Sequence, residues 1–256
     1  MAITNTTIAK IARGEPTFGA WVSTMSPRAA EVFGVNGFDW AVIDMEHTPV
    51  GATGVEAVVR GIERHDLTPL VRIPDIDAGI RGTCKRVLDS GAQGIIVPRV
   101  ETAEQAEAVV EAAFYPPEGE RGVVGSSRAN YYGSKFSAYV EQANDELFVC
   151  VQLETAAGAA RADEILAVDG VNGVFIGEND LSATHGAAGE KTEQAVQDDV
   201  DAIVAAAADH DVYTGTVAAT PEKIATRVEQ GFDLISLGSD LYFVGRSIGQ
   251  LHPERE

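Results

Sequence analysis

Four short stretches of this sequence carry acids, amides, a histidine and an arginine at the ends of short apolar runs. They are Asp44-Met45-Glu46-His47, Val71-Arg72, Gln152-Leu153-Glu154 and Gly177-Glu178-Asn179-Asp180. Side chains of these types bind metal ions, move protons and stabilise anions. If the fold brings the four stretches to one place, they form a reaction site.

Glu154 and Asp180 are the candidate metal ligands. We expect them to come from adjacent strands at matching heights, and two carboxylates that face each other must bind a cation or share a proton. With only two protein ligands, the rest of the coordination shell stays open to water and substrate, as is typical of Mg²⁺ or Mn²⁺. Two alternatives stay open: Asp180 caps a turn at Leu181–Thr184, or Glu154 is a surface acid before the next helix.

His47 and Arg72 are the candidates for proton transfer and anion binding. A histidine among acids at a strand end suits general acid–base chemistry near neutral pH. An arginine there favours a planar anion such as a carboxylate or enolate. The alternatives are a histidine packed against the rim of the fold, and a structural salt bridge of Arg72 with Asp44 or Asp75.

The lysines argue against Schiff-base chemistry, which needs a lysine near a strand end inside the fold. None of the five lysines meets this condition, and Lys191 follows the sixth apolar run by many residues. If the protein handles carbanions of keto acids, a metal ion must therefore stabilise the enolate.

Eight β-rich runs alternate with helix-like stretches, which predicts a single-domain (β/α)8 barrel over residues 1–256. An open doubly wound sheet is the alternative, but Ser23-Thr24-Met25-Ser26-Pro27 after the first run is not its glycine-rich phosphate turn. The segment Tyr115–Ala143 is irregular and polar, and long loops are often functional. The expected strands are Phe18–Val22, Asp39–Ile43, Leu70–Ile73, Gly94–Val97, Phe148–Leu153, Gly173–Ile176, Tyr213–Val217 and Leu234–Leu237. The expected helices are Arg28–Phe33, Gly54–Arg64, Ala78–Leu88, Ala103–Ala113, Ala157–Leu166, Thr192–Ala208, Pro221–Gln230 and one from Asp240.

The charge balance excludes several partners. With 39 acidic and 19 basic residues, the net charge of -20 argues against nucleic acid and against an anionic membrane surface. The acids favour a solvated acidic surface, and the scarcity of lysine resembles proteins of salt-loving microbes. Cys84 and Cys150 are expected to be reduced thiols in a cytoplasmic protein. No apolar run reaches the roughly 18 residues that span a membrane.

The order and spacing of several motifs closely resemble the HpcH/HpaI aldolase family, the class II pyruvate aldolases. The resemblance runs from about Gly19 to Gly245. Its motifs are Phe38-Asp39-Trp40 through Asp44-x-Glu46-His47-x-Pro49, Val71-Arg72, Tyr115-Pro116-Pro117-x-Gly119-x-Arg121-Gly122, Val151-Gln152-x-Glu154-Thr155 and Gly173-Val174-Phe175-Ile176-Gly177-x-x-Asp180-Leu181-Ser182.

The resemblance assigns a role to each candidate residue. Glu154 and Asp180 match metal ligands, His47 the catalytic base, and Arg72 the residue that stabilises the pyruvate enolate. Asp89 matches an acid that raises the basicity of the histidine and can be supplied by a neighbouring subunit. Gln152, Gly177, Asn179 and Asp180 match substrate contacts, Asn179 through its backbone N–H. The family also implies a homo-oligomer, commonly a hexamer built as a trimer of dimers.

The resemblance implies a reversible retro-aldol cleavage of a 4-hydroxy-2-keto acid to pyruvate and an aldehyde. It uses Mg²⁺, Mn²⁺ or Co²⁺ and no organic cofactor. One departure stands out: Glu178-Asn179 replaces the usual Pro-x before Asp180, which is expected to add a charge beside the metal. The alternatives are a malyl-CoA or citryl-CoA type lyase, disfavoured by the few basic residues, and a non-catalytic barrel that binds a keto acid.

Overall fold

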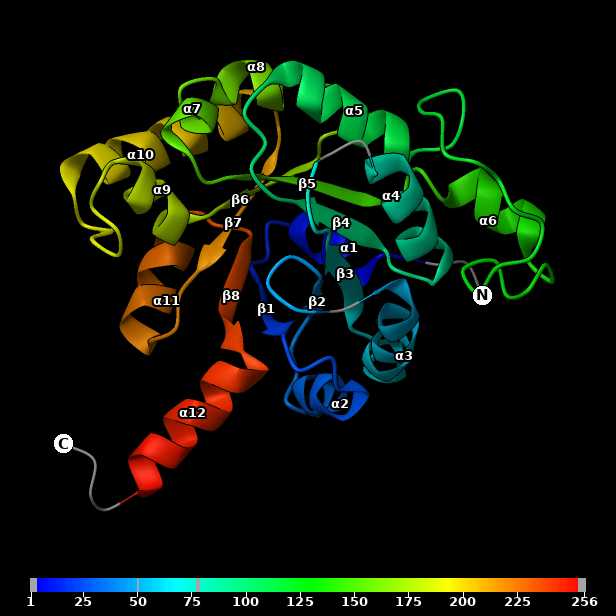
Figure 1. The fold of residues 1–256 in the computed structure, drawn as a ribbon, viewed down its shortest axis with the longest axis horizontal. Helices are drawn as coiled ribbons and strands as arrows, with labels where there is room; N and C mark the ends of the chain where they lie inside the picture. The colour runs from blue at the N-terminus through cyan, green and yellow to red at the C-terminus, as the bar shows by residue number, and fades with distance from the viewer. Residues whose placement is uncertain (1–3, 50, 77–78, 253–256) are drawn as a thin grey trace.

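The structure, a computed structural model, describes residues 4–49, 51–76 and 79–252. Within these residues eight parallel strands close into a barrel in sequence order, which confirms the predicted (β/α)8 fold (Figure 1). The strands are β1 (Thr17–Val22), β2 (Trp40–Asp44), β3 (Thr68–Arg72), β4 (Gly94–Val97), β5 (Phe148–Leu153), β6 (Gly173–Ile176), β7 (Tyr213–Val217) and β8 (Leu234–Ser239).

Alternation along the strands divides the core in two. The larger cluster lies between the strands and the covering helices, and the smaller one fills the barrel interior with large side chains such as Trp40, Phe148 and Phe175. Gly19 leaves the room that Trp40 needs, because a Cβ at Gly19 would lie 2.0 Å from the indole ring. Burial on both faces explains why the strands are continuous apolar runs.

The covering helices begin where their capping residues predict. Ser26 and Thr220 cap α2 and α11 from just before a proline, and Thr102 forms a capping box with Gln105. The bounds of these elements are α2 (Pro27–Val35), α3 (Ala52–Ile62), the 3-10 turn η1 (Glu63–His65), α4 (Ile80–Asp89), α5 (Ala103–Ala113), α7 (Ala156–Ala159), α8 (Ala162–Leu166), α9 (Glu178–Thr184), α10 (Gln194–Asp209), α11 (Pro221–Glu229) and α12 (Asp240–Leu251). The stretch expected as one helix at Ala157–Leu166 forms two, and the expected start at Ala78 lies outside the described residues.

Three helices have no counterpart in the sequence prediction. α9 begins at Glu178, where the sequence suggested only a turn at Leu181–Thr184. α1 (Thr6–Ile11) precedes β1, and its Ile11 joins the interior cluster of the barrel. α6 (Phe136–Gln142) lies within the segment expected to be irregular, so the prediction for Tyr115–Ala143 was wrong at its C-terminal end. α6 and the loop before it project from one side of the barrel (Figure 1).

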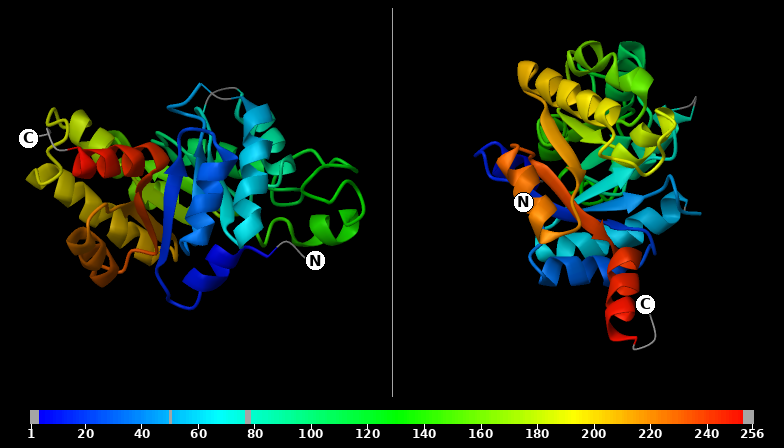
Figure 2. Two further views of the ribbon diagram at one scale, coloured as in Figure 1. Left: turned by 90° about the horizontal axis from the view of Figure 1, so that it is seen from below. Right: turned by 90° about the vertical axis from the view of Figure 1, so that its left-hand side faces the viewer.

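The last helix, α12, leaves the barrel. It contacts β8 and β1 at its start and then extends away from the other helices (Figures 1 and 2). Its apolar residues recur at a helical spacing that places them on one face. More than half of the surface of each residue is exposed: Leu241 56%, Val244 55%, Ile248 55% and Leu251 82%.

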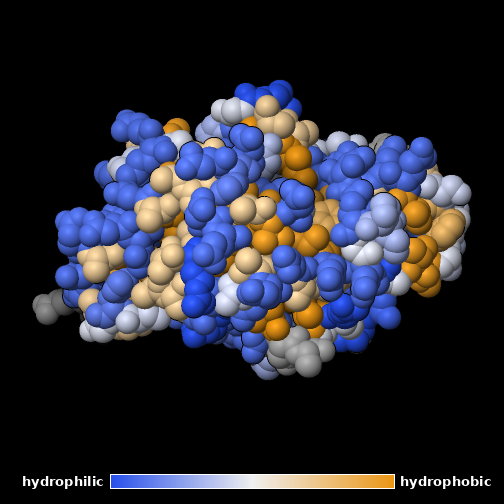
Figure 3. Space-filling view, turned by 90° about the horizontal axis from the view of Figure 1, so that it is seen from above, coloured by the Kyte–Doolittle hydropathy of each residue, from blue (hydrophilic) through white to orange (hydrophobic). Residues whose placement is uncertain are grey.

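Hydrophilic residues cover much of the remaining surface, with hydrophobic patches between them on the face shown in Figure 3. None of the helices in the described part of the chain combines the length and apolar character needed to cross a membrane. Cys84 and Cys150 are buried and unpaired, as expected from the sequence.

Candidate active site

The alternation that fills the barrel also positions the polar site. On β2 the inward positions Trp40 and Val42 are followed two residues later by Asp44, and on β5 Cys150 is followed by Gln152. The last inward positions of β2 and β5 are therefore polar and lie at the carboxyl end of the barrel, where active sites of this fold form. Asp44 and Arg72 are register partners on neighbouring strands.

Arg72 is held by two carboxylates and one aromatic ring. Its Nε and Nη2 donate to the two Asp44 oxygens at 3.0 and 2.9 Å. Its Nη1 lies 2.8 Å from Glu46 Oε2, an ion pair without hydrogen-bond geometry. The guanidinium stacks 4.4 Å from the ring centroid of Trp21. The salt bridge to Asp44 that the sequence left open is thus present, whereas Asp75 instead accepts from the Ile76 N–H.

Glu154 is almost fully buried, at 2% exposure, so it is not the surface acid of the alternative interpretation. Its Oε1 accepts from the Arg99 N–H at 3.0 Å, and its Oε2 accepts from the Gln152 amide. Gly177 makes this position possible, because a Cβ there would lie 2.6 Å from Glu154 Cβ. Gln152 Oε1 is buried without a hydrogen-bond partner among the described residues.

Negative charge is in excess around Glu154. Burial of its carboxyl, together with the negative charges of Glu46 and Asp180, raises the pKa of Glu154 to about 7, although Arg72 opposes the shift. Burial likewise raises the pKa of Glu46. Carboxylates that raise one another's pKa in a buried site favour a bound cation. The chemistry of the side chains therefore fits a hard divalent ion with oxygen ligands.

Asp180 lies in the first turn of α9 with its side chain exposed. The helix begins after Gly177, and no side chain caps it, so the interpretation of Asp180 as a cap was wrong. In the part of the chain that the structure describes, no three His, Cys, Asp or Glu side chains gather as a metal-holding group. A metal ion here would have Glu154 and Asp180 as its protein ligands and an otherwise open shell.

A cavity of about 250 Å³ opens beside these residues at the carboxyl end of the barrel. This volume lies just below the roughly 300–1,000 Å³ of sites for drug-sized ligands and suits a small keto acid. Its walls include nearly all of the predicted contacts: His47, Arg72, Gln152, Gly177, Asn179 and Asp180. Lys191 also lines it, from the loop between α9 and α10 and not from a strand end.

Glu178 does not add a free charge beside the metal site. Its carboxylate is buried at 6% exposure, and Oε1 accepts from Arg227 Nη2 at 2.6 Å and from Thr216 Oγ1 at 2.9 Å. Arg227 comes from α11 and Thr216 from β7. The expectation of a free charge was wrong because the neutralising guanidinium comes from α11, and its contact with Glu178 depends on tertiary packing that the sequence does not reveal.

His47 lies on the rim of the cavity, with 67% of its side chain exposed, and its Nε2 is 3.7 Å from Glu46 Oε2. This exposure contradicts the alternative of a histidine packed against the rim. The imidazole is open to solvent and substrate, as a proton-transfer group must be.

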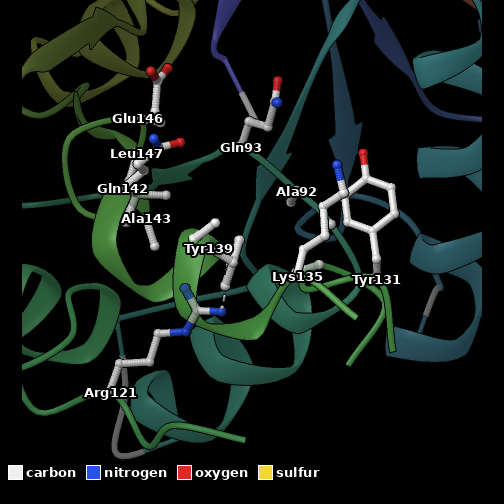
Figure 4. A pocket seen from close by; sticks show the side chains of 13 residues that line it. Ala92, Gln93, Arg121, Tyr131, Lys135, Tyr139, Gln142, Ala143, Glu146 and Leu147 are labelled. Atoms are coloured by element: carbon white, nitrogen blue, oxygen red, sulfur yellow. Dashed lines mark hydrogen bonds between the residues drawn. The ribbon is translucent and has the colours of Figure 1, made fainter. Parts of the chain in front are cut away.

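Asp89 does not meet His47 within one chain. It ends α4 at the amino end of the barrel, and its Oδ1 accepts from Arg121 Nη2 at 2.8 Å. Arg121 also reaches the Tyr139 hydroxyl, at the wall of a separate cavity of about 100 Å³ near the start of β4 (Figure 4). A role of Asp89 toward His47 stays a prediction and requires a second copy of the chain.

Several residues of the site escaped the sequence reasoning. The ring of Trp21 stacks on the Arg72 guanidinium, and Glu46 forms an ion pair with Arg72. The Arg99 N–H donates a hydrogen bond to Glu154. Glu46 and Arg99 follow strands two and four, so their positions gave a signal. The only sequence signal for Trp21 was its inward-facing position on the first strand. Thr216, which donates to Glu178, lies one residue before the end of β7 and was also missed.

Comparisons with known proteins identify the family of the chain. The family model for HpcH/HpaI aldolase/citrate lyase matches residues 17–246. A 2-dehydro-3,6-dideoxy-6-sulfogluconate aldolase from Pseudomonas putida is 37% identical over 230 residues, covering 90% of this chain and 88% of the relative. A hydroxypyruvate/pyruvate aldolase from Roseovarius nubinhibens is 36% identical over 253 residues, covering 97% and 96%.

Solved structures give the same result. The crystal structure of an HpcH/HpaI aldolase/citrate lyase family protein from Burkholderia cenocepacia matches with a TM-score of 0.90 and 32% identity, over 96% of this chain and 97% of that one. The family model, the aldolase relatives and the fold coincide over nearly the whole sequence. The chain therefore belongs to the HpcH/HpaI aldolase/citrate lyase family and is a carbon–carbon lyase.

Proposed function

We propose that this barrel is a metal-dependent aldolase that reversibly cleaves a 4-hydroxy-2-keto acid into pyruvate and an aldehyde. The observation that carries the proposal is Glu154, a buried carboxylate whose pKa is raised by burial and by neighbouring acids beside a cavity of small-molecule size. Relatives named as pyruvate and sugar-acid aldolases support the substrate class.

Glu154 and Asp180 would hold the divalent ion, Mg²⁺, Mn²⁺ or Co²⁺. When bound, the ion supplies positive charge next to the keto-acid oxygens, where negative charge grows as the carbon–carbon bond breaks. Arg72 adds a second positive group on the same side of the cavity. Because Asp44 and Glu46 fix its orientation before substrate arrives, its guanidinium needs little reorganisation during the reaction.

His47 is the group placed to move protons. Its ring is exposed on the cavity rim, and no hydrogen bond to another described residue occupies its side chain. It can take the proton of the C4 hydroxyl, directly or through water, as the bond between C3 and C4 breaks. The cleavage leaves an aldehyde and the enolate of pyruvate, and a proton returned to C3 completes pyruvate.

Deuterium exchange at the pyruvate methyl group tests the proposal without knowledge of the aldehyde. We expect the protein to exchange these protons in D₂O with Mn²⁺ and to stop when a chelator is added. We expect His47→Ala to slow the exchange by roughly 100-fold or more, the usual size of a general base contribution. Proton NMR of pyruvate follows the loss of signal.

The control for that experiment is His210→Ala, because His210 pairs with Asp163 away from the site. Exchange at the full rate in chelator would remove the metal from the chemistry. A parent protein that binds pyruvate but never exchanges it would be a non-catalytic keto-acid-binding barrel.

We further propose that the protein works as a homo-oligomer, as a trimer of dimers. The support is the apolar face of α12, which projects from the barrel instead of covering it. Val32 and Val35 on α2, beside β1, are also exposed, at 57% and 72%. Exposed apolar faces of this extent favour burial against another protein surface.

Charges on α12 should break the assembly. We expect Val244→Asp combined with Ile248→Asp to lower the molar mass measured by light scattering to a smaller species, because each buried carboxylate would need an expensive desolvation. Gly245→Asp with Gln250→Asp adds the same charge at exposed positions elsewhere on the same helix and serves as the control. An unchanged mass in the first variant would show that this face is not an interface.

A further inference from the structure

The cavity contains one positive group that the chemistry described so far does not use. Arg72 is paired with Asp44 and Glu46, and Glu178 is paired with Arg227. Asp180 is assigned to the metal ion. Lys191 lines the same cavity, and no carboxylate in the described part of the chain forms an ion pair with it.

The partial burial of Lys191 agrees with its place in the cavity wall. Its neighbours Glu190 and Thr192 are exposed, whereas Lys191 is half-buried. Lys191 is half-buried in a cavity and forms no ion pair among the described residues, and partial burial of its charge calls for a counter-charge.

The loop that carries Lys191 is tied to the turn that carries Asp180. The Gly189 N–H donates to Ser182 Oγ at 2.9 Å, and the Ser182 hydroxyl donates to the Asn179 carbonyl at 2.7 Å. The carbonyl of Lys191 itself accepts from Gln197 Nε2 at 2.6 Å. The backbone that carries the lysine is thus held at a set position relative to the turn that carries Asp180, which a specificity residue requires.

Glu178 does not compete for Lys191, although both line the cavity. Its carboxylate is already satisfied by Arg227 and Thr216. The pair therefore leaves the lysine free for substrate.

We infer that Lys191 binds an anionic group at the far end of the acceptor aldehyde, so that the enzyme favours aldehydes with a carboxylate, sulfonate or phosphate over neutral ones. The inference rests on the proposed aldolase function. It assigns the acceptor rather than pyruvate because Lys191 comes from a loop beyond α9, outside the ring of strands. The donor keto acid lies with Arg72 and the ion-binding acids at the strand ends.

The test compares two acceptors of equal chain length, succinic semialdehyde and butanal, in Mn²⁺-dependent addition to pyruvate. The parent protein should have a higher kcat/KM for the anionic aldehyde. In Lys191→Met this preference should fall by about 10-fold or more, the usual range for a lost charge-assisted hydrogen bond. Lys191→Arg should keep most of it. Lys223→Met, at an exposed position on α11, makes the same charge change away from the cavity and should leave the preference at the parent value.

The outcomes separate the two proposals. If the parent does not exchange the pyruvate methyl protons, the proposed function fails. The inference is overturned if the parent exchanges these protons but Lys191→Met lowers kcat/KM for both aldehydes equally. It is also overturned if the substitution raises only the KM of pyruvate, because Lys191 then does not bind the acceptor.

Discussion

Glu154→Gln should abolish metal-dependent cleavage and at the same time stabilise the metal-free protein. The substitution keeps the shape of the side chain but removes the negative charge that a divalent ion needs. The loss in kcat/KM, measured with Mn²⁺, should be at least about 1000-fold, the scale on which a lost electrostatic contact to developing charge acts. Glu101→Gln, in which the changed side chain accepts from the Thr155 hydroxyl, should retain activity.

The stability gain follows from the direction of the pKa shift. The pKa of Glu154 is raised in the folded protein to about 7 from 4.5, so the charged form is disfavoured by folding. In chelator, the parent should lose stability as pH rises from about 4.5 to 7, by up to about 3 kcal/mol, while the variant does not. The orphaned Gln152 Oε1 can turn to accept from the new amide. Equal melting temperatures of parent and variant at pH 8 would contradict this account.

Arg72→Lys should be almost as damaging to catalysis, although it keeps the charge. Lysine offers a single point charge and cannot bond both Asp44 oxygens and Glu46 while it stacks on Trp21. We expect kcat/KM to fall by roughly 100-fold or more, and unfolding free energy by about 1–3 kcal/mol because Asp44 loses buried bonds.

Arg81→Lys is the matched control, because Arg81 also pairs with two acids, Glu111 and Glu120, but on an exposed surface. Exposed pairs contribute about 0–1 kcal/mol, so this variant should behave like the parent. An Arg72→Lys variant with parent activity would show that a positive charge alone is enough at that position.

Local sequence patterns predicted the barrel well because its strands are apolar on both faces and its helices begin at capping residues. The alternation of strands and helices was enough to place Arg72, Glu154 and Asp180 at one end of the barrel. It also placed His47 on the same rim, and none of these assignments required knowledge of long-range packing.

The remaining features depend on packing between distant segments. The sequence suggested a free charge at Glu178, but its partner Arg227 lies 49 residues further along the chain, on α11. Lys191 reaches the cavity through a loop whose position depends on Ser182 and Gln197. Asp89 lies at the other end of the barrel beside Arg121, so its part in catalysis depends on assembly.

A crystal structure of the protein grown with Mn²⁺ and pyruvate, with anomalous scattering recorded to locate the manganese, tests the central claim most directly. The account predicts one manganese peak coordinated by carboxylate oxygens of both Glu154 and Asp180, with pyruvate beside it and within reach of Arg72. A structure in which pyruvate occupies the cavity while these two carboxylates bind no manganese would contradict it.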